Sequence, residues 1–115
     1  MTPSESARWA ATVAVPAYAR RVTRHDHVKR WADRMSTLAD ASASRVVDCL
    51  DELTVMLTST TRQPSLHRAA VAARWAMCAA SGIGGVRVDG GRAVFYARMT
   101  AKLARRVLPG DEEER

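Results

Sequence analysis

Apolar residues recur at helical spacing along most of the chain, and two of the resulting stripes are especially regular. The first consists of Val28, Trp31, Ala32, Met35, Leu38 and Ala39, and the second of Val46, Cys49, Leu50, Leu53 and Leu57. We therefore predict a helix that starts after Asp26, a favourable N-cap residue, and runs to about Ala39. A further helix is predicted over Arg45–Ser59, with Ser42 or Ser44 as its N-cap.

Three other stretches also have helical spacing. We predict helices over Ser4–Val22, Ser65–Gly82 and Ala97–Leu108. Ser4 or Ser6 is expected to cap the first, and Pro16 should kink or split it because proline lacks a backbone donor. Gly82 is a natural residue at the end of a helix. The stretch Thr58–Pro64, which is poor in helix formers, is expected to be a loop.

Between the last two helices, the stretch Val86–Tyr96 alternates in a way that indicates a β-hairpin. Gly90-Gly91 would supply the positive φ angles of a two-residue turn. A turn one residue earlier would set Arg87 opposite Arg92, a like-charge pair that costs stability. The predicted fold is mainly α with one hairpin, a winged helix-turn-helix of about five helices and a two-stranded wing. It forms a single domain over residues 1–110, and an acidic, disordered tail follows over residues 111–115.

Positive charge is concentrated in the second half of the chain. Residues 61–108 contain one acid, Asp89, and nine basic residues: Arg62, Arg68, Arg74, Arg87, Arg92, Arg98, Lys102, Arg105 and Arg106. Residues 1–60 nearly balance, with eight basic and seven acidic residues, and the whole chain carries a formal net charge of +6. Segregated charge of one sign attracts polyanions, so it indicates a nucleic acid or an acidic partner.

The predicted helix over residues 65–82 has one side without acids. This side gathers His67, Arg68, Val71, Arg74, Trp75 and Cys78. A helix of this kind could enter the major groove of DNA, where arginine bonds to guanine. The candidate nucleic-acid-binding residues are His67, Arg68 and Arg74 on this helix, with Arg62, Arg87 and Arg92 as backbone contacts. In the structural alternative, Trp75 packs beneath the hairpin or in a dimer interface, and the arginines are merely solvated.

The stretch Ala80–Arg98 resembles the end of the recognition helix and the wing of ArsR-type winged-helix regulators. In that family the helix closes on a small-Gly-apolar turn, and a strand, an Asp-Gly-Arg-like turn, a Val-x-Tyr strand and a C-terminal helix follow. Plasmid and phage partition proteins are similar in form. The resemblance implies a winged helix that binds double-stranded DNA. The family's metal-sensing cysteine pair is absent, so no metal sensing is implied.

Other chemistries find little support in the sequence. The chain has no phosphate-binding Gly-x-x-x-x-Gly-Lys loop. The two histidines that flank Asp26 are too few ligands for a zinc site. His67 and Cys78 would lie on the order of 16 Å apart along one helix, too far for proton transfer. We therefore predict a non-enzyme with no catalytic residue, metal or cofactor. The two cysteines are expected to be reduced in a cytoplasmic protein, and no uncharged run has the length of a membrane span.

These observations favour a sequence-specific DNA-binding protein, either a transcriptional regulator or a partition-type protein. We expect it to be a homodimer through its first and last helices, because dimers read two half-sites. The alternative is a helical interaction module that binds protein or RNA, such as a small subunit of a phage or ribonucleoprotein assembly. A small antagonist of a host enzyme is a third class.

Overall fold

The computed structural model describes residues 1–59 and 63–109. Six α-helices, one π-helical turn and one 3₁₀ turn occur in these residues. In chain order they are α1 (Pro3–Trp9), η1 (Ala10–Ala14), α2 (Val15–Val22), α3 (Asp26–Met35), α4 (Ala43–Ser59), α5 (Pro64–Ser81), η2 (Ile83–Gly85) and α6 (Gly90–Leu103). The described residues contain no β-strand, so the prediction of a winged helix with a two-stranded wing is wrong.

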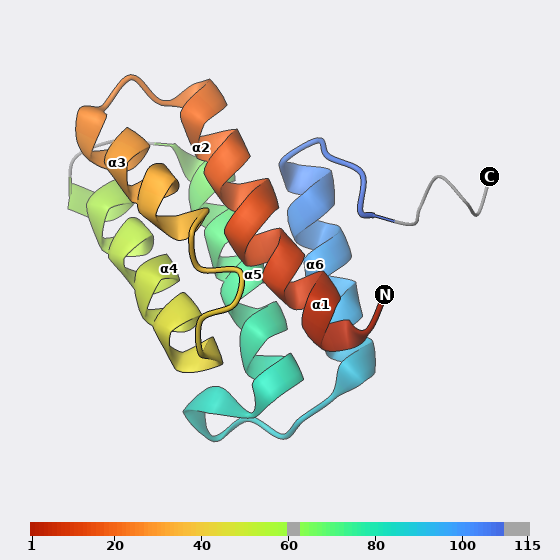
Figure 1. The fold of residues 1–115 in the computed structure, drawn as a ribbon. Coiled ribbons are helices and arrows are strands. Elements are labelled where there is room, and N and C mark those ends of the chain that lie inside the picture. Colours follow the sequence, from red (N-terminus) through yellow and green to blue (C-terminus); the bar gives the residue numbers. More distant parts are fainter. Residues whose placement is uncertain (60–62, 110–115) are drawn as a thin grey trace.

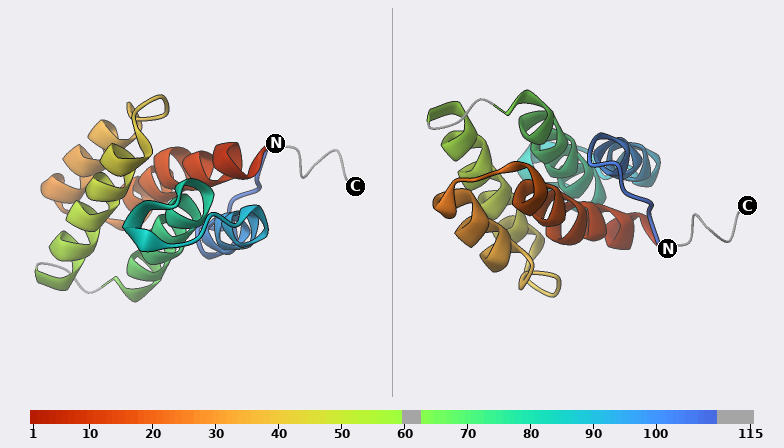
Figure 2. Two further views of the ribbon diagram at one scale, coloured as in Figure 1. Left: turned by 90° about the horizontal axis from the view of Figure 1, so that it is seen from below. Right: turned by 90° about the horizontal axis from the view of Figure 1, so that it is seen from above.

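The helices form two layers (Figures 1 and 2). Helices α4, α5 and α6 lie side by side in one layer, with α5 in the middle. The continuous α1–η1–α2 segment packs across α5 and α6, and α3 packs against α2 and α4. The buried side chains of these helices form one hydrophobic cluster, which contains Trp31, Leu50, Leu53, Leu66 and Met77.

The first helical segment continues through Pro16 rather than breaking there. Pro16 cannot donate a hydrogen bond to the carbonyl of Thr12, and the chain adjusts with the π-helical turn η1 just before it. The amide of Val15 bonds to the carbonyl of Ala10, five residues earlier. At the start, Thr2 and Glu5 form a capping box, so the expected cap at Ser4 or Ser6 is wrong.

Helix α4 buries its whole predicted stripe, and α3 buries its stripe from Val28 to Met35. The last two predicted members, Leu38 and Ala39, lie beyond the end of α3, and Ala39 is exposed. The indole Nε1 of Trp31 donates to the carbonyl of Cys49 at 2.6 Å and so joins the two helices inside the core. Ser42 caps α4, because its hydroxyl accepts a hydrogen bond from the amide of Arg45 at 3.2 Å. Asp26 is the first residue of α3 rather than its cap, which is His25 without a side-chain hydrogen bond.

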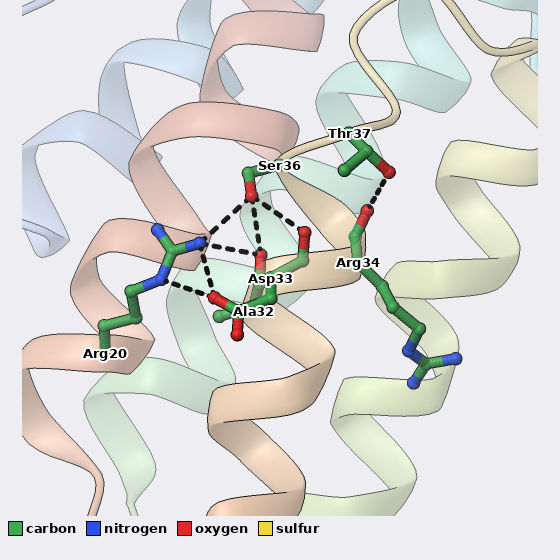
Figure 3. A network of polar contacts seen from close by, with 6 residues as sticks. All are labelled: Arg20, Ala32, Asp33, Arg34, Ser36 and Thr37. Carbon is green, nitrogen blue, oxygen red and sulfur yellow. Dashed lines mark hydrogen bonds and ion pairs between the residues drawn. The ribbon is translucent and has the colours of Figure 1, made fainter.

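Helix α3 ends at Met35, four residues earlier than predicted. The hydroxyl of Ser36 donates to the carbonyls of Ala32 and Asp33, and that of Thr37 donates to the carbonyl of Arg34 (Figure 3). Such local bonds compete with continued helix.

A guanidinium from the neighbouring α2 holds this end of α3 in place. Nη2 of Arg20 contacts Oδ1 of Asp33 and the hydroxyl of Ser36, both at 3.0 Å (Figure 3). This network fixes the contact between α2 and α3.

The connection between α5 and α6 replaces the predicted hairpin. Gly82 ends α5 with a φ of +77°, as expected. The chain then runs extended through residues 86–89 without a strand partner in the described part of the chain. Its one backbone bond to α5 joins the amide of Asp89 to the carbonyl of Ala79 at 2.8 Å.

Gly90 and Gly91 are the first two residues of α6 rather than a hairpin turn. The carboxylate of Asp89 caps the helix by accepting a hydrogen bond from the amide of Arg92 at 3.1 Å. These residues form a helix and not a hairpin because the small residues that follow recur at helical spacing. Ala93, Ala97, Ala101 and Ala104 share one side of the helix and are buried. A strand over residues 92–96 would break this stripe, whereas a helix packs it against α5.

Helix α6 ends at Leu103 instead of Leu108, in a turn that contains the only non-glycine residue with positive φ among the described residues. This residue is Arg105, with φ of +54°. The amide of Arg106 bonds to the carbonyl of Ala101 at 2.7 Å, as in a Schellman motif. Glycine is the usual residue at this position because a Cβ strains the left-handed conformation.

Arg105→Gly is therefore expected to raise the free energy of unfolding by about 0.5–1 kcal/mol, since relieved strain outweighs the added entropy of the unfolded chain. Urea denaturation followed by circular dichroism measures the change. Arg106→Gly is the matched control, because it removes the same charge at a residue without positive φ. Equal changes of the free energy of unfolding in the two variants would contradict backbone strain at Arg105.

Candidate functional site

The structure does not gather the predicted nucleic-acid-binding residues on one surface. His67, Arg68 and Arg74 lie on α5, Arg87 lies in the connection after α5, and Arg92 lies in the first turn of α6. Arg62 falls outside the described residues. Arg68 and Arg87 belong to opposite ends of α5, about 20 Å apart along its axis at 1.5 Å per residue. His67 and Arg68 line a common groove.

The side chain of Arg74 is held by the neighbouring helix. Its Nε donates to Oδ1 of Asp51 on α4 at 2.7 Å, and its Nη1 lies 3.9 Å from Sγ of Cys78. The hydrogen bond with Asp51 raises the pKa of Arg74 above its ordinary value. Because both side chains are partly exposed, we expect this ion pair to contribute little to stability. Its main consequence is that the charge of Arg74 is compensated within the chain.

A shallow apolar groove lies between α5 and α6. Its volume is about 540 Å³, and it is lined by His67, Arg68, Val71, Ala72, Trp75, Met99 and Leu103. The sequence places large residues here because alanines occupy the sides of α5 and α6 that pack together. The remaining large side chains of both helices are then left on the outside.

An aromatic cluster continues the groove toward the start of α6. The rings of Trp75 and Tyr96 have centroids 5.1 Å apart and meet edge to face, and those of Phe95 and Tyr96 are 5.3 Å apart. Trp75 is 49% exposed and Phe95 is 59% exposed. We call the outer surface of these two helices the α5–α6 face. It is formed by Arg68, Val71, Trp75, Phe95, Tyr96, Met99 and Leu103.

Sequence reasoning identified part of this surface and missed the rest. It placed Trp75 beside Arg68 on the outer side of one helix, as the structure does. Phe95 was expected in the hairpin over Val86–Tyr96, and a strand there would not have placed it on the same surface as Trp75. The helical spacing of Phe95, Met99 and Leu103 was the signal that could have joined them.

Charges of opposite sign border the α5–α6 face. On the side of α6, Arg92 and Lys102 are exposed, and Nε of Arg92 lies 3.7 Å from Oδ2 of Asp89. On the side of α4 lie the carboxylates of Asp48 and Asp51, next to Val55, which is 65% exposed. The layer of α4, α5 and α6 therefore carries Asp48 and Asp51 along one edge and Arg92 and Lys102 along the other, and the apolar groove and the aromatic rings lie between these edges.

Both cysteines are buried free thiols. Desolvation is the main cause that raises the pKa of Cys49 and of Cys78 above the ordinary value of 9.0. The thiolate form, which is the nucleophile, is therefore disfavoured in the folded chain. These cysteines do not have the environment of a catalytic thiol.

Two measurements test this state of the cysteines. Alkylation by iodoacetamide at neutral pH is expected to be much slower in the folded chain than in urea. Because the folded chain holds the thiol protons more tightly, the free energy of unfolding should fall as the pH rises above 9.0. A Cys49→Ala/Cys78→Ala variant should lose that part of the pH dependence. An unchanged pH dependence in this variant would contradict the raised pKa values.

Other sites find no structural support in the described part of the chain. Within residues 1–59 and 63–109, no three His, Cys, Asp or Glu side chains come together in a way that could hold a metal ion. Nδ1 of His27 lies 2.9 Å from Nη2 of Arg30 at the start of α3. In the same residues, no helix combines the length and the apolar character that crossing a membrane requires.

Comparison with models of known protein families gave no match for this chain, and comparisons with curated proteins and with solved structures gave none either. The function is therefore argued from the geometry of the α5–α6 face.

Proposed function

We propose that the chain is a non-enzymatic protein-interaction module whose α5–α6 face binds another protein. The observation that carries the proposal is the pair of exposed rings, Trp75 and Phe95, on either side of Tyr96. Exposed aromatic side chains next to an apolar groove are typical of the centre of a protein interface. The basic and acidic side chains around them would form its polar rim.

The distribution of charge favours a protein over a nucleic acid. Arg74 is compensated by Asp51, and Arg92 lies beside Asp89. A duplex on this face would meet the carboxylates of Asp48 and Asp51 as well as the cations, which weakens phosphate binding. Helix α5 also lies between α4 and α6 in one layer, so it does not project as a groove-reading helix must (Figure 2).

The proposal includes a reducing, cytoplasmic setting. It is supported by the two free thiols, which are buried and carry no disulfide among the described residues.

The experiment compares protein binding with nucleic-acid binding. Proteins captured by the chain are purified and tested for direct binding, the chain itself is tested for self-association, and duplex DNA and RNA are titrated in parallel. Trp75→Ala is expected to weaken the protein contact about tenfold or more, because it removes the central ring. Val13→Ala is the matched control, since Val13 is an exposed apolar residue on the other layer.

Two results would contradict the proposal. One is protein binding that Trp75→Ala leaves unchanged. The other is saturable binding of DNA or RNA at physiological salt that Trp75→Ala leaves intact.

A further inference from the structure

Resting on this proposed function, we infer that the protein that covers the α5–α6 face is a second copy of the chain. The two copies form a two-fold symmetric dimer in which the layers of α4, α5 and α6 meet face to face. In this dimer, the two α5 helices lie alongside each other at the centre and run in the same direction, and α4 of each copy lies against α6 of its partner.

The distribution of charge across the face supports a second copy. One edge of the layer carries the exposed Asp48 on α4, next to the Asp51 that pairs with Arg74, and the other carries the exposed Arg92 and Lys102 on α6. A two-fold interface uses the same surface on both copies, so this surface must be complementary to itself. When the second copy is turned over, its basic α6 edge lies on the acidic α4 edge of the first copy, so the face is complementary to itself.

Only one of the two in-plane symmetry axes brings unlike charges together. Rotation about an axis parallel to α5 exchanges the two edges, so α4 of one copy faces α6 of the other. Rotation about an axis perpendicular to the helices places α4 on α4 and opposes acidic edges, which is unfavourable. Charge complementarity therefore selects the axis parallel to α5.

This axis also determines which residues meet, because the rotation keeps each residue at its own height along α5. Asp51 lies at the height of Arg74 on α5, and the neighbouring Trp75 lies at the height of Tyr96 on α6. Helices α4 and α6 both run antiparallel to α5 (Figure 1).

Asp48, one turn before Asp51, therefore reaches the height of Arg92 on the partner's α6. Val55, one turn after Asp51, reaches the height of Met99. The exposed Val55 is thus covered by apolar surface, and Asp48 of α4 gains a basic partner.

The size of the face is sufficient for a stable dimer. The molecule measures 35 × 35 × 23 Å, and the short dimension corresponds to the two helix layers. A broad face of this size can supply the roughly 800 Å² per copy that a standard interface buries. Helices α1 and α6, through which the sequence predicted a dimer, pack against each other within one chain.

The test uses two charge reversals and their mixture, with mass measured by sedimentation equilibrium. We expect the wild-type chain to be dimeric, and Asp48→Arg and Arg92→Glu each to weaken the dimer about tenfold or more. In an equal mixture of the two variants, a basic α4 meets an acidic α6 at one contact, and the natural pair meets at the other. The mixture is therefore expected to form a heterodimer of near wild-type affinity. Asp40→Arg and Lys29→Glu, at exposed positions away from this layer, are the matched controls.

Three results would overturn this inference: a wild-type chain that is monomeric at high concentration, a dimer that neither reversal weakens, or a mixture that stays as weak as the single variants. Circular dichroism shows that each variant is folded. If the chain is monomeric but binds a different protein through Trp75, the proposed function stands and only the second copy is excluded. If no protein binding depends on Trp75, the proposed function itself fails.

Discussion

Trp31→Ala is expected to lower the free energy of unfolding by about 3–5 kcal/mol, the largest effect of any single substitution that we consider. Trp31 is fully buried between α3 and α4, and its removal leaves a large cavity. It also removes the hydrogen bond from Nε1 to the carbonyl of Cys49. Urea denaturation followed by far-ultraviolet circular dichroism measures the change.

Trp31→Phe separates the two contributions, because it keeps most of the ring volume and loses the donor. We expect it to cost about 2 kcal/mol, between wild type and Trp31→Ala. Trp75→Ala is the control on the surface, and we expect it to change the stability of the monomer by less than about 1 kcal/mol. Equal losses for Trp31→Ala and Trp75→Ala would contradict the core as described.

Ala97→Leu is expected to destabilise the chain by about 3 kcal/mol, because the enlarged side chain has no space in the core where α6 packs against α5 and α1. Ala97 is fully buried in the hydrophobic cluster, and it belongs to the stripe of alanines on the packed side of α6. Leucine has a high intrinsic helix propensity, so the loss would come from packing alone. Thermal and urea denaturation both measure the effect.

Lys102→Leu introduces the same residue on the exposed side of α6 and is expected to leave the stability within about 0.5 kcal/mol of wild type. The pair also tests the correction of the predicted hairpin. If residues 92–96 formed an outer strand, Ala97 would begin a separate helix and would not lie where α6 packs against α5 and α1. A tolerated Ala97→Leu would therefore contradict the helix over residues 90–103.

The sequence predicted the helices whose period is unambiguous. The stripe of α4 is buried throughout, and that of α3 is buried from Val28 to Met35. Gly82 ends α5 and Ser42 caps the start of α4, as predicted. Both positions were predictable because a capping residue acts on the backbone groups of its immediate neighbours. Prediction was less precise where a short polar contact decides the end of a helix, as at Ser36.

The stretch from Val86 to Tyr96 could not be assigned from its own residues. Alternating apolar residues around two glycines fit a hairpin, and the same residues fit an Asp89-capped helix. The decisive interaction is long-range, because α6 is stabilised by burying its alanines on α5. A helical stripe that continues through Ala101 and Ala104 outweighs the local hairpin pattern.

The candidate site was predictable only in part, for a related reason. Trp75 and Arg68 share a side of one helix, so helical geometry alone places them together. The hydrogen bond from Arg74 to Asp51 joins residues 23 positions apart on different helices, so the pattern of neither helix predicts it. The contact of Phe95 and Tyr96 with Trp75 depended on the structure of the misassigned stretch.

Hydroxyl-radical footprinting can show directly whether a protein binds the α5–α6 face, because it reports which side chains a bound protein covers. The chain is oxidised at low and at high concentration, and the modification of each residue is measured by mass spectrometry. We expect Trp75, Phe95 and Met99 to become protected as the concentration rises, while the exposed Met1 stays equally reactive. Unchanged oxidation of Trp75 and Phe95 over this range, with protection appearing on other helices instead, would contradict binding at this face.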